Sequence, residues 1–163
     1  MALVNKADVI KEMKTGLLDL TWLNLAGGTS SFQNGFTYDQ QISDTGSPFF
    51  IIHQNSSSIK DSDSHSGDVA MEHVFEIDIL VDWSQLESTT DDERRSLAMQ
   101  WVREATDATF VYLVNTQRLV DWGINDTAFN YNFGITDSNN LEANLFGKTI
   151  SFTLQDSVVF NTP

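Results

Sequence analysis

The chain has 163 residues, of which 40% are hydrophobic and 20% charged, a composition typical of one folded domain and not of a disordered chain. It contains no cysteine, which excludes disulfides, thiolate metal sites and cysteine nucleophiles. Its 23 acidic and nine basic residues give a net charge of −14. This charge argues against a nucleic-acid-binding protein, because phosphates are normally neutralised by several Lys or Arg side chains.

The first predicted element is an amphipathic helix from Asn5 to about Leu23. Asn5 is a suitable cap, and apolar residues then recur at helical spacing. Gly27-Gly28 ends this pattern, and the polar stretch that follows predicts a long loop over about 27–47, either without regular structure or with one short strand. The periodic residues are Val9, Ile10, Met13, Leu17 and Leu20.

Two strands with a polar segment between them come next. Residues 48–53 form a short apolar run, and residues 73–83 alternate between apolar and acidic side chains. The polar segment predicts a second long loop, over about 54–72, that joins the strands as an antiparallel hairpin. On the second strand we expect Phe75, Ile77, Ile79 and Val81 on one face, and Glu76, Asp78 and Asp82 on the other.

The remaining chain predicts one long helix and three strands. The capping box Thr90-Asp91-Asp92-Glu93 starts a helix that reaches about Asn115, although residues 110–114 also have strand propensity. Strands are expected at 118–124, 128–135 and 148–154. The order α-β-β-α-β-β-β predicts one α+β domain over residues 1–163, with two main helices on one face of an antiparallel or mixed sheet.

The sequence shows no motif of a known catalytic class. It has no nucleophile elbow, P-loop, dinucleotide fingerprint or HExxH zinc motif. We therefore expect no enzyme and no cofactor. It also has no run of about 18 to 20 apolar residues, the length that a membrane-spanning helix needs.

The best candidate for an ion site is the acidic segment at residues 61–72. Its first, third and twelfth positions are carboxylates, as in a calcium-binding EF-hand loop. However, the glycine falls one residue late and a strand pattern follows instead of a helix, so an acidic hairpin loop is the simpler interpretation. His53 and His73 flank the segment, and either pairing across the hairpin or joint ligation would explain their spacing. The candidate ligands are Asp61, Asp63, His65, Asp68 and Glu72.

The order of elements resembles the tail-terminator proteins of long-tailed bacteriophages. The shared features are an amphipathic first helix, a long-looped strand pair ending in Phe-x-Ile-x-Ile at residues 75–79, a Trp-bearing central helix and a final hairpin. Residues 145–154 are similar to the last strand of that family, and residues 133–141 to the hairpin leading into it. The resemblance covers roughly residues 8–156.

This resemblance implies a virion structural subunit, assembled in the host cytoplasm and located in the tail or neck. It implies a homohexameric ring that caps the tail tube, contacts the tail tube protein and the head-completion or neck proteins, and lets DNA pass through its lumen without specific binding. It implies no cofactor and no membrane. Another phage neck or tail-completion protein is one alternative, and a cellular acidic binding or accessory module, with calcium bound at 61–72, is another.

The chain also offers candidates for contacts between subunits. Its 11 Phe and four Trp residues are more large aromatics than one small core needs, and aromatics are enriched at interfaces. Long polar loops are often functional as well. We expect interface residues in the second loop and at apolar positions outside the periodic stripes: Ser56, Ser57, Ser58, Ile59, Lys60, Phe32, Phe36, Phe110, Val111 and Phe146.

Overall fold

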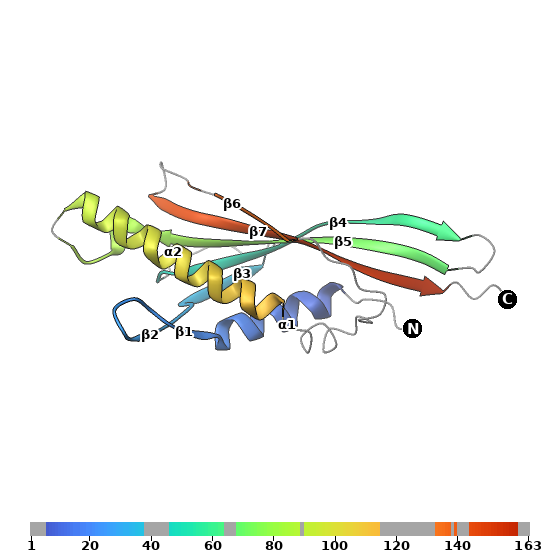
Figure 1. Cartoon of the computed structure of the whole chain (residues 1–163), viewed down its shortest axis with the longest axis horizontal. Coiled ribbons are helices and arrows are strands. Elements are labelled where there is room, and N and C mark those ends of the chain that lie inside the picture. Colours follow the sequence, from blue (N-terminus) through green and yellow to red (C-terminus); the bar gives the residue numbers. More distant parts are fainter. Residues whose placement is uncertain are drawn as a thin grey trace.

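The structure is a computed structural model that describes residues 6–37, 46–63, 68–88, 90–114, 133–137, 139 and 144–159. In these residues it has two α-helices, seven strands and one 3-10 turn (Figure 1). The α+β class is confirmed. The elements are α1 Lys6–Asp19, β1 Thr21–Leu23, β2 Thr29–Ser31, β3 Asn34–Thr37, β4 Phe49–Asp63, β5 Asp68–Asp82, η1 Trp83–Gln85, α2 Asp91–Leu113, β6 Phe133–Asp137 and β7 Leu145–Val159.

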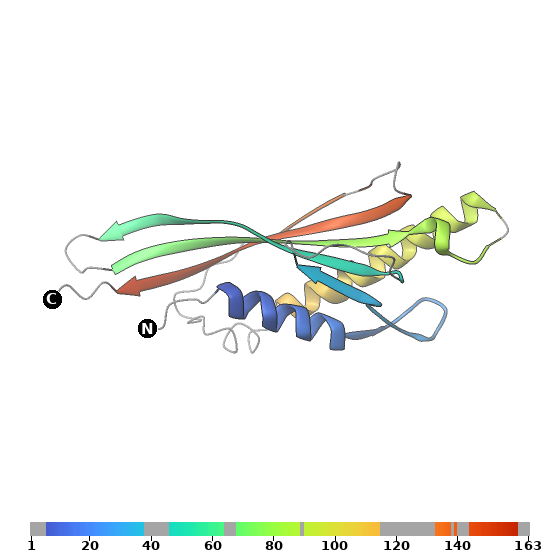
Figure 2. The same cartoon turned by 180° about the vertical axis from the view of Figure 1, so that it is seen from behind.

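The main sheet has five strands in the order β3-β4-β5-β7-β6. All neighbours are antiparallel except β3, which runs parallel to β4. Strands β1 and β2 form a separate antiparallel hairpin. Both helices lie on one face of the main sheet, as the views from the two sides show (Figures 1 and 2). The prediction of helices on one face of a mixed sheet is therefore confirmed.

The main core lies between the two helices and this face of the sheet. The period-two pattern of β5 places its alternate apolar residues inward, as predicted, and Phe75 stacks on Phe152 of β7 with ring centroids 5.5 Å apart. Each fully buried side chain of this size contributes about 1.5–3 kcal/mol relative to exposure. The fully buried apolar residues are Val9, Met13 and Leu17 of α1, Phe50 and Ile52 of β4, Phe75, Ile77, Ile79 and Val81 of β5, Ala98 and Ala105 of α2, and Ile150 of β7.

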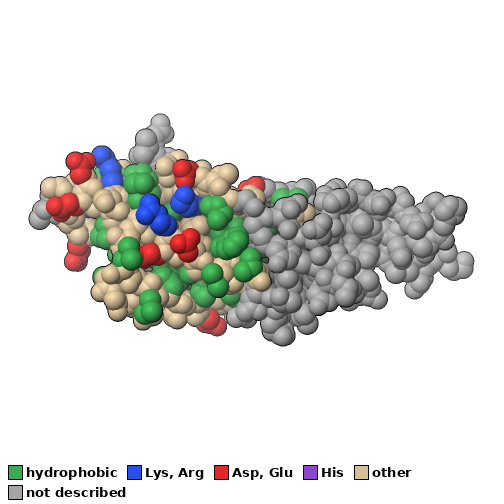
Figure 3. Space-filling view, in the orientation of Figure 1, with side chains coloured by type: hydrophobic (Ala, Val, Ile, Leu, Met, Phe, Trp, Pro, Cys, Tyr) green, Lys and Arg blue, Asp and Glu red, His purple; other side chains and the backbone are tan. Residues whose placement is uncertain are grey.

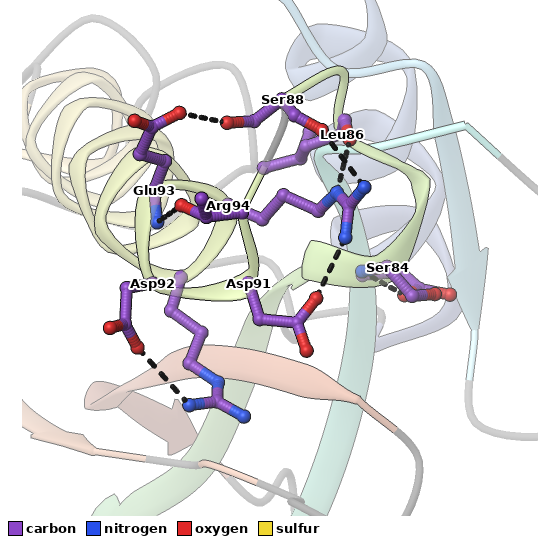
Figure 4. Close-up of polar contacts among 10 residues, drawn as sticks. Ser84, Leu86, Ser88, Asp91, Asp92, Glu93 and Arg94 are labelled. Carbon is purple, nitrogen blue, oxygen red and sulfur yellow. Dashed lines mark hydrogen bonds and ion pairs between the residues drawn. The ribbon is translucent and has the colours of Figure 1, made fainter.

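The start of α2 follows the predicted capping box. The Thr90 side chain accepts a hydrogen bond from the backbone N–H of Glu93 at 3.2 Å, and acidic residues occupy the first turn. The Arg94 guanidinium donates hydrogen bonds to Asp91 at 2.7 Å and to the backbone carbonyls of Leu86 and Ser88 (Figure 4). These bonds tie the first turn of α2 to the segment before it. The helix continues to Leu113, so residues 110–113 are helical and not a strand.

The first helix is shorter than predicted. It ends at Asp19, and residues 21–23 form β1, whose Trp22 packs edge-to-face against Phe32 with centroids 5.1 Å apart. The segment predicted as a loop over 27–47 contains β2 and β3. The predicted cap Asn5, the strand at 118–124 and residues 128–132 of the next strand lie outside the described residues.

The second predicted loop, over 54–72, is wrong. Strands β4 and β5 each have 15 residues and stay paired as far as Asp63 and Asp68, so only residues 64–67 lie between them. The ladder accommodates two register shifts, at Gln54/Ser56 and Ile59/Asp61. Local composition favoured a loop, but β5 is paired over its whole length with β7 as well as with β4. This long-range pairing overrides the weak strand propensity of Ser, Asn and Asp.

Candidate subunit-interaction surfaces

Three strands extend beyond the part of the sheet that the helices cover. The ends of β4, β5 and β7 continue past α1 and α2 in both views (Figures 1 and 2). We call residues 55–63, 68–72 and 154–159 the β-arm. Within it, β5 is the central strand, with Asp68 opposite both Asp63 of β4 and Val159 of β7.

The outer edges of the β-arm have no neighbouring strand among the described residues. Strand β3 pairs with β4 only over Phe49–Ile52. Strand β6 pairs with β7 only over Lys148–Phe152. An edge without a neighbouring strand offers its backbone N–H and C=O groups to water or to another segment of chain, and it can bind an added strand from a partner.

The structure separates the predicted interface residues into four groups. Ser56, Ser57, Ser58, Ile59 and Lys60 lie on the outer strand β4 of the β-arm, although in a strand and not in the predicted loop. Val111 is exposed, at 66%. Phe110 and Phe146 are partly buried and pack against the two main clusters of core residues.

The assignment of Phe32 and Phe36 to an interface is wrong. Phe32 is 4% exposed and meets the ring of Phe50 edge-on at 5.0 Å. Phe36 is 6% exposed and lies in the same way 6.0 Å from Phe49. Both rings are core residues of their own subunit, so neither is accessible to a neighbour.

The acidic segment at 61–72 does not form an EF-hand loop. Asp61 and Asp63 lie at the end of β4, while Asp68 and Glu72 lie on β5. Glu72 pairs with Ser58 and is four residues along the strand from Asp68, a Cα separation of about 13 Å. An EF-hand holds its ligands in one 12-residue loop between two helices, whereas residues 61–63 and 68–72 lie in paired strands. Residue His65 lies outside the described residues.

The two histidines that flank the hairpin do not face each other. His53 aligns with Glu76, and His73 aligns with Ser57. His73 is buried, whereas His53 is half-buried on the opposite face of the sheet. The explanation of their spacing by pairing across the hairpin is therefore wrong.

A polar row crosses the face of the sheet away from the helices. His53 Nε2 on β4 lies 2.9 Å from Asp78 Oδ2 on β5, and the Thr149 hydroxyl on β7 donates to Asp78 Oδ1 at 2.6 Å. A hydrolytic triad needs the hydroxyl to donate to the histidine. Here the Thr149 hydroxyl and the His53 imidazole both bind the Asp78 carboxylate, so the row joins three strands.

A small apolar projection lies at the tip of the β1–β2 hairpin. Leu23 and Leu25 are 81% and 79% exposed, the largest values among the described hydrophobic side chains. We call these two residues the leucine knob. Asn24 holds the tip by accepting from the Gly28 N–H at 2.9 Å and donating to Ser30 at 2.8 Å.

The base of this hairpin meets α2 around a pocket of about 150 Å³. Its polar groups bond within the protein: Ser30 accepts from Asn24, Ser47 accepts from the Asp82 N–H, and Glu104 Oε1 accepts from the Leu25 N–H at 3.1 Å. The residues around this pocket thus hold the hairpin against α2. It is lined by Trp22, Thr29, Ser30, Ser31, Gln33, Ser47, Pro48, Trp101 and Glu104.

A second hollow, of about 140 Å³, lies between α2, the start of β7 and the end of β6. We call it the α2–β7 groove. Met99, Val102 and Phe146 give it apolar walls, and Arg103 and Lys148 add positive charge. Asp137 also lines it and accepts from Lys148 at 3.0 Å. Lys and Arg side chains gather over the helix-covered half of the molecule, among hydrophobic side chains (Figure 3).

The described residues show no cluster of three or more potential metal ligands, and neither described helix is long and apolar enough to cross a membrane. The candidate contact surfaces in this part of the chain are the outer edges of the β-arm, the leucine knob and the α2–β7 groove. No protein-family model and no curated protein sequence matches the chain.

Proposed function

We propose that the chain is a structural subunit of a virion, of the kind that the tail-terminator resemblance implies. In this role it forms a ring that caps a tail tube and joins it to head-completion or neck proteins. The β-arm is the observation that carries the proposal.

The strands that carry the β-arm are longer than a compact subunit of this size is wide. A strand of 15 residues is roughly 50 Å long, whereas a compact chain of 163 residues is roughly 40 Å across.

The charge supports the same role. A net charge of −14 would oppose contact with DNA, which is itself a dense line of negative charge. In a ring whose lumen carries part of this charge, DNA passes without adhering. Glu76, Asp78 and Asp82 lie on the sheet face away from the helices and offer such charge, with the buried Leu80 between the last two.

The test is to shorten the β-arm and measure the mass of the protein in solution. Ser58 and Glu72 are direct partners, so a two-residue Asn-Gly turn can replace residues 59–71 and keep the hairpin closed. Glu72 is also opposite Gln155, so the same variant ends after residue 155. The residues of the helix-covered core are unchanged.

A matched control replaces only residues 64–67 with Asn-Gly. Asp63 and Asp68 are direct partners, so this control changes the turn and leaves both strand edges intact. Light scattering after size exclusion should give the mass of a ring for the unaltered chain and for the control. It should give the mass of a monomer for the shortened chain, which stays folded. A shortened chain that still forms rings would show that the β-arm does not mediate assembly.

A further inference from the structure

We draw no further inference here: the strongest candidate, the outer edges of the β-arm on β4 and β7, belongs to the surface already proposed for assembly, and nothing in the structure shows what borders these edges, because the residues that follow β3 and those that precede β6 in the chain lie outside the described residues.

Discussion

Gly35 of β3 lies directly against the ring of Phe50 on β4. A Cβ atom at position 35 would be 2.1 Å from Cζ of that ring, which is fully buried and cannot move aside. Gly35→Ala should therefore lower the free energy of unfolding by about 1–3 kcal/mol, the usual cost of overpacking. Urea denaturation followed by circular dichroism measures it. Gly28→Ala, where the nearest atom would be 3.4 Å away, should change stability far less, and equal losses would contradict the packing described.

Truncating a side chain of the main core should lower the free energy of unfolding more than truncating one beside the hairpin pocket. Phe75 is fully buried and stacked on Phe152, so Phe75→Ala should cost about 3–5 kcal/mol. Trp101 is only partly buried beside the hairpin pocket, and Trp101→Ala should cost less, about 1–2 kcal/mol. Both losses come from the same denaturation experiment. A larger loss at Trp101 than at Phe75 would place the main core elsewhere.

The cap of α2 should make a separate, smaller contribution. Thr90→Ala removes the acceptor of the Glu93 N–H and should cost about 1 kcal/mol. The control is Ser96→Ala on the same helix, where the side chain is exposed and the change raises helix propensity. Thermal unfolding should separate the two variants, with only Thr90→Ala lowering the midpoint. Equal midpoints would mean that the cap does not form in solution.

Self-association should strengthen as salt is added. Copies with a charge of −14 repel one another, and ions screen this repulsion beyond roughly 8–10 Å at physiological ionic strength. Light scattering across a series from low to high sodium chloride should show an increasing mean mass. A mass that decreases steadily with salt would instead mean that attraction between charges dominates the contact.

Much of the helix-covered half of the fold could be predicted from sequence. The alternation from Phe75 to Val81 and the capping box at Thr90 are local patterns, and both elements form where these patterns place them. The β-arm could not be predicted, because its strands depend on pairing between β4, β5 and β7, residues distant in sequence. Phe32 was misassigned for a similar reason, since the β1–β2 hairpin folds back and places this ring on Phe50.

The candidate contact surfaces could not be located from sequence either. The positions of Ser56–Lys60 on an outer strand follow from tertiary pairing, and the role predicted for them as contacts stays a prediction. The leucine knob gave no periodic signal, because Leu23 and Leu25 lie in a short hairpin after the first helix. The groove is formed by residues of α2, β6 and β7, which sequence spacing alone cannot bring together.

Electron microscopy of the purified protein in negative stain shows directly whether the chain assembles into the proposed closed ring. At high protein concentration and high salt, class averages of the unaltered chain should show closed rings of one size with an open centre. The shortened β-arm variant, prepared in parallel, should show only small single particles. Class averages of the unaltered chain with no closed ring, at every salt and protein concentration, would contradict this proposal.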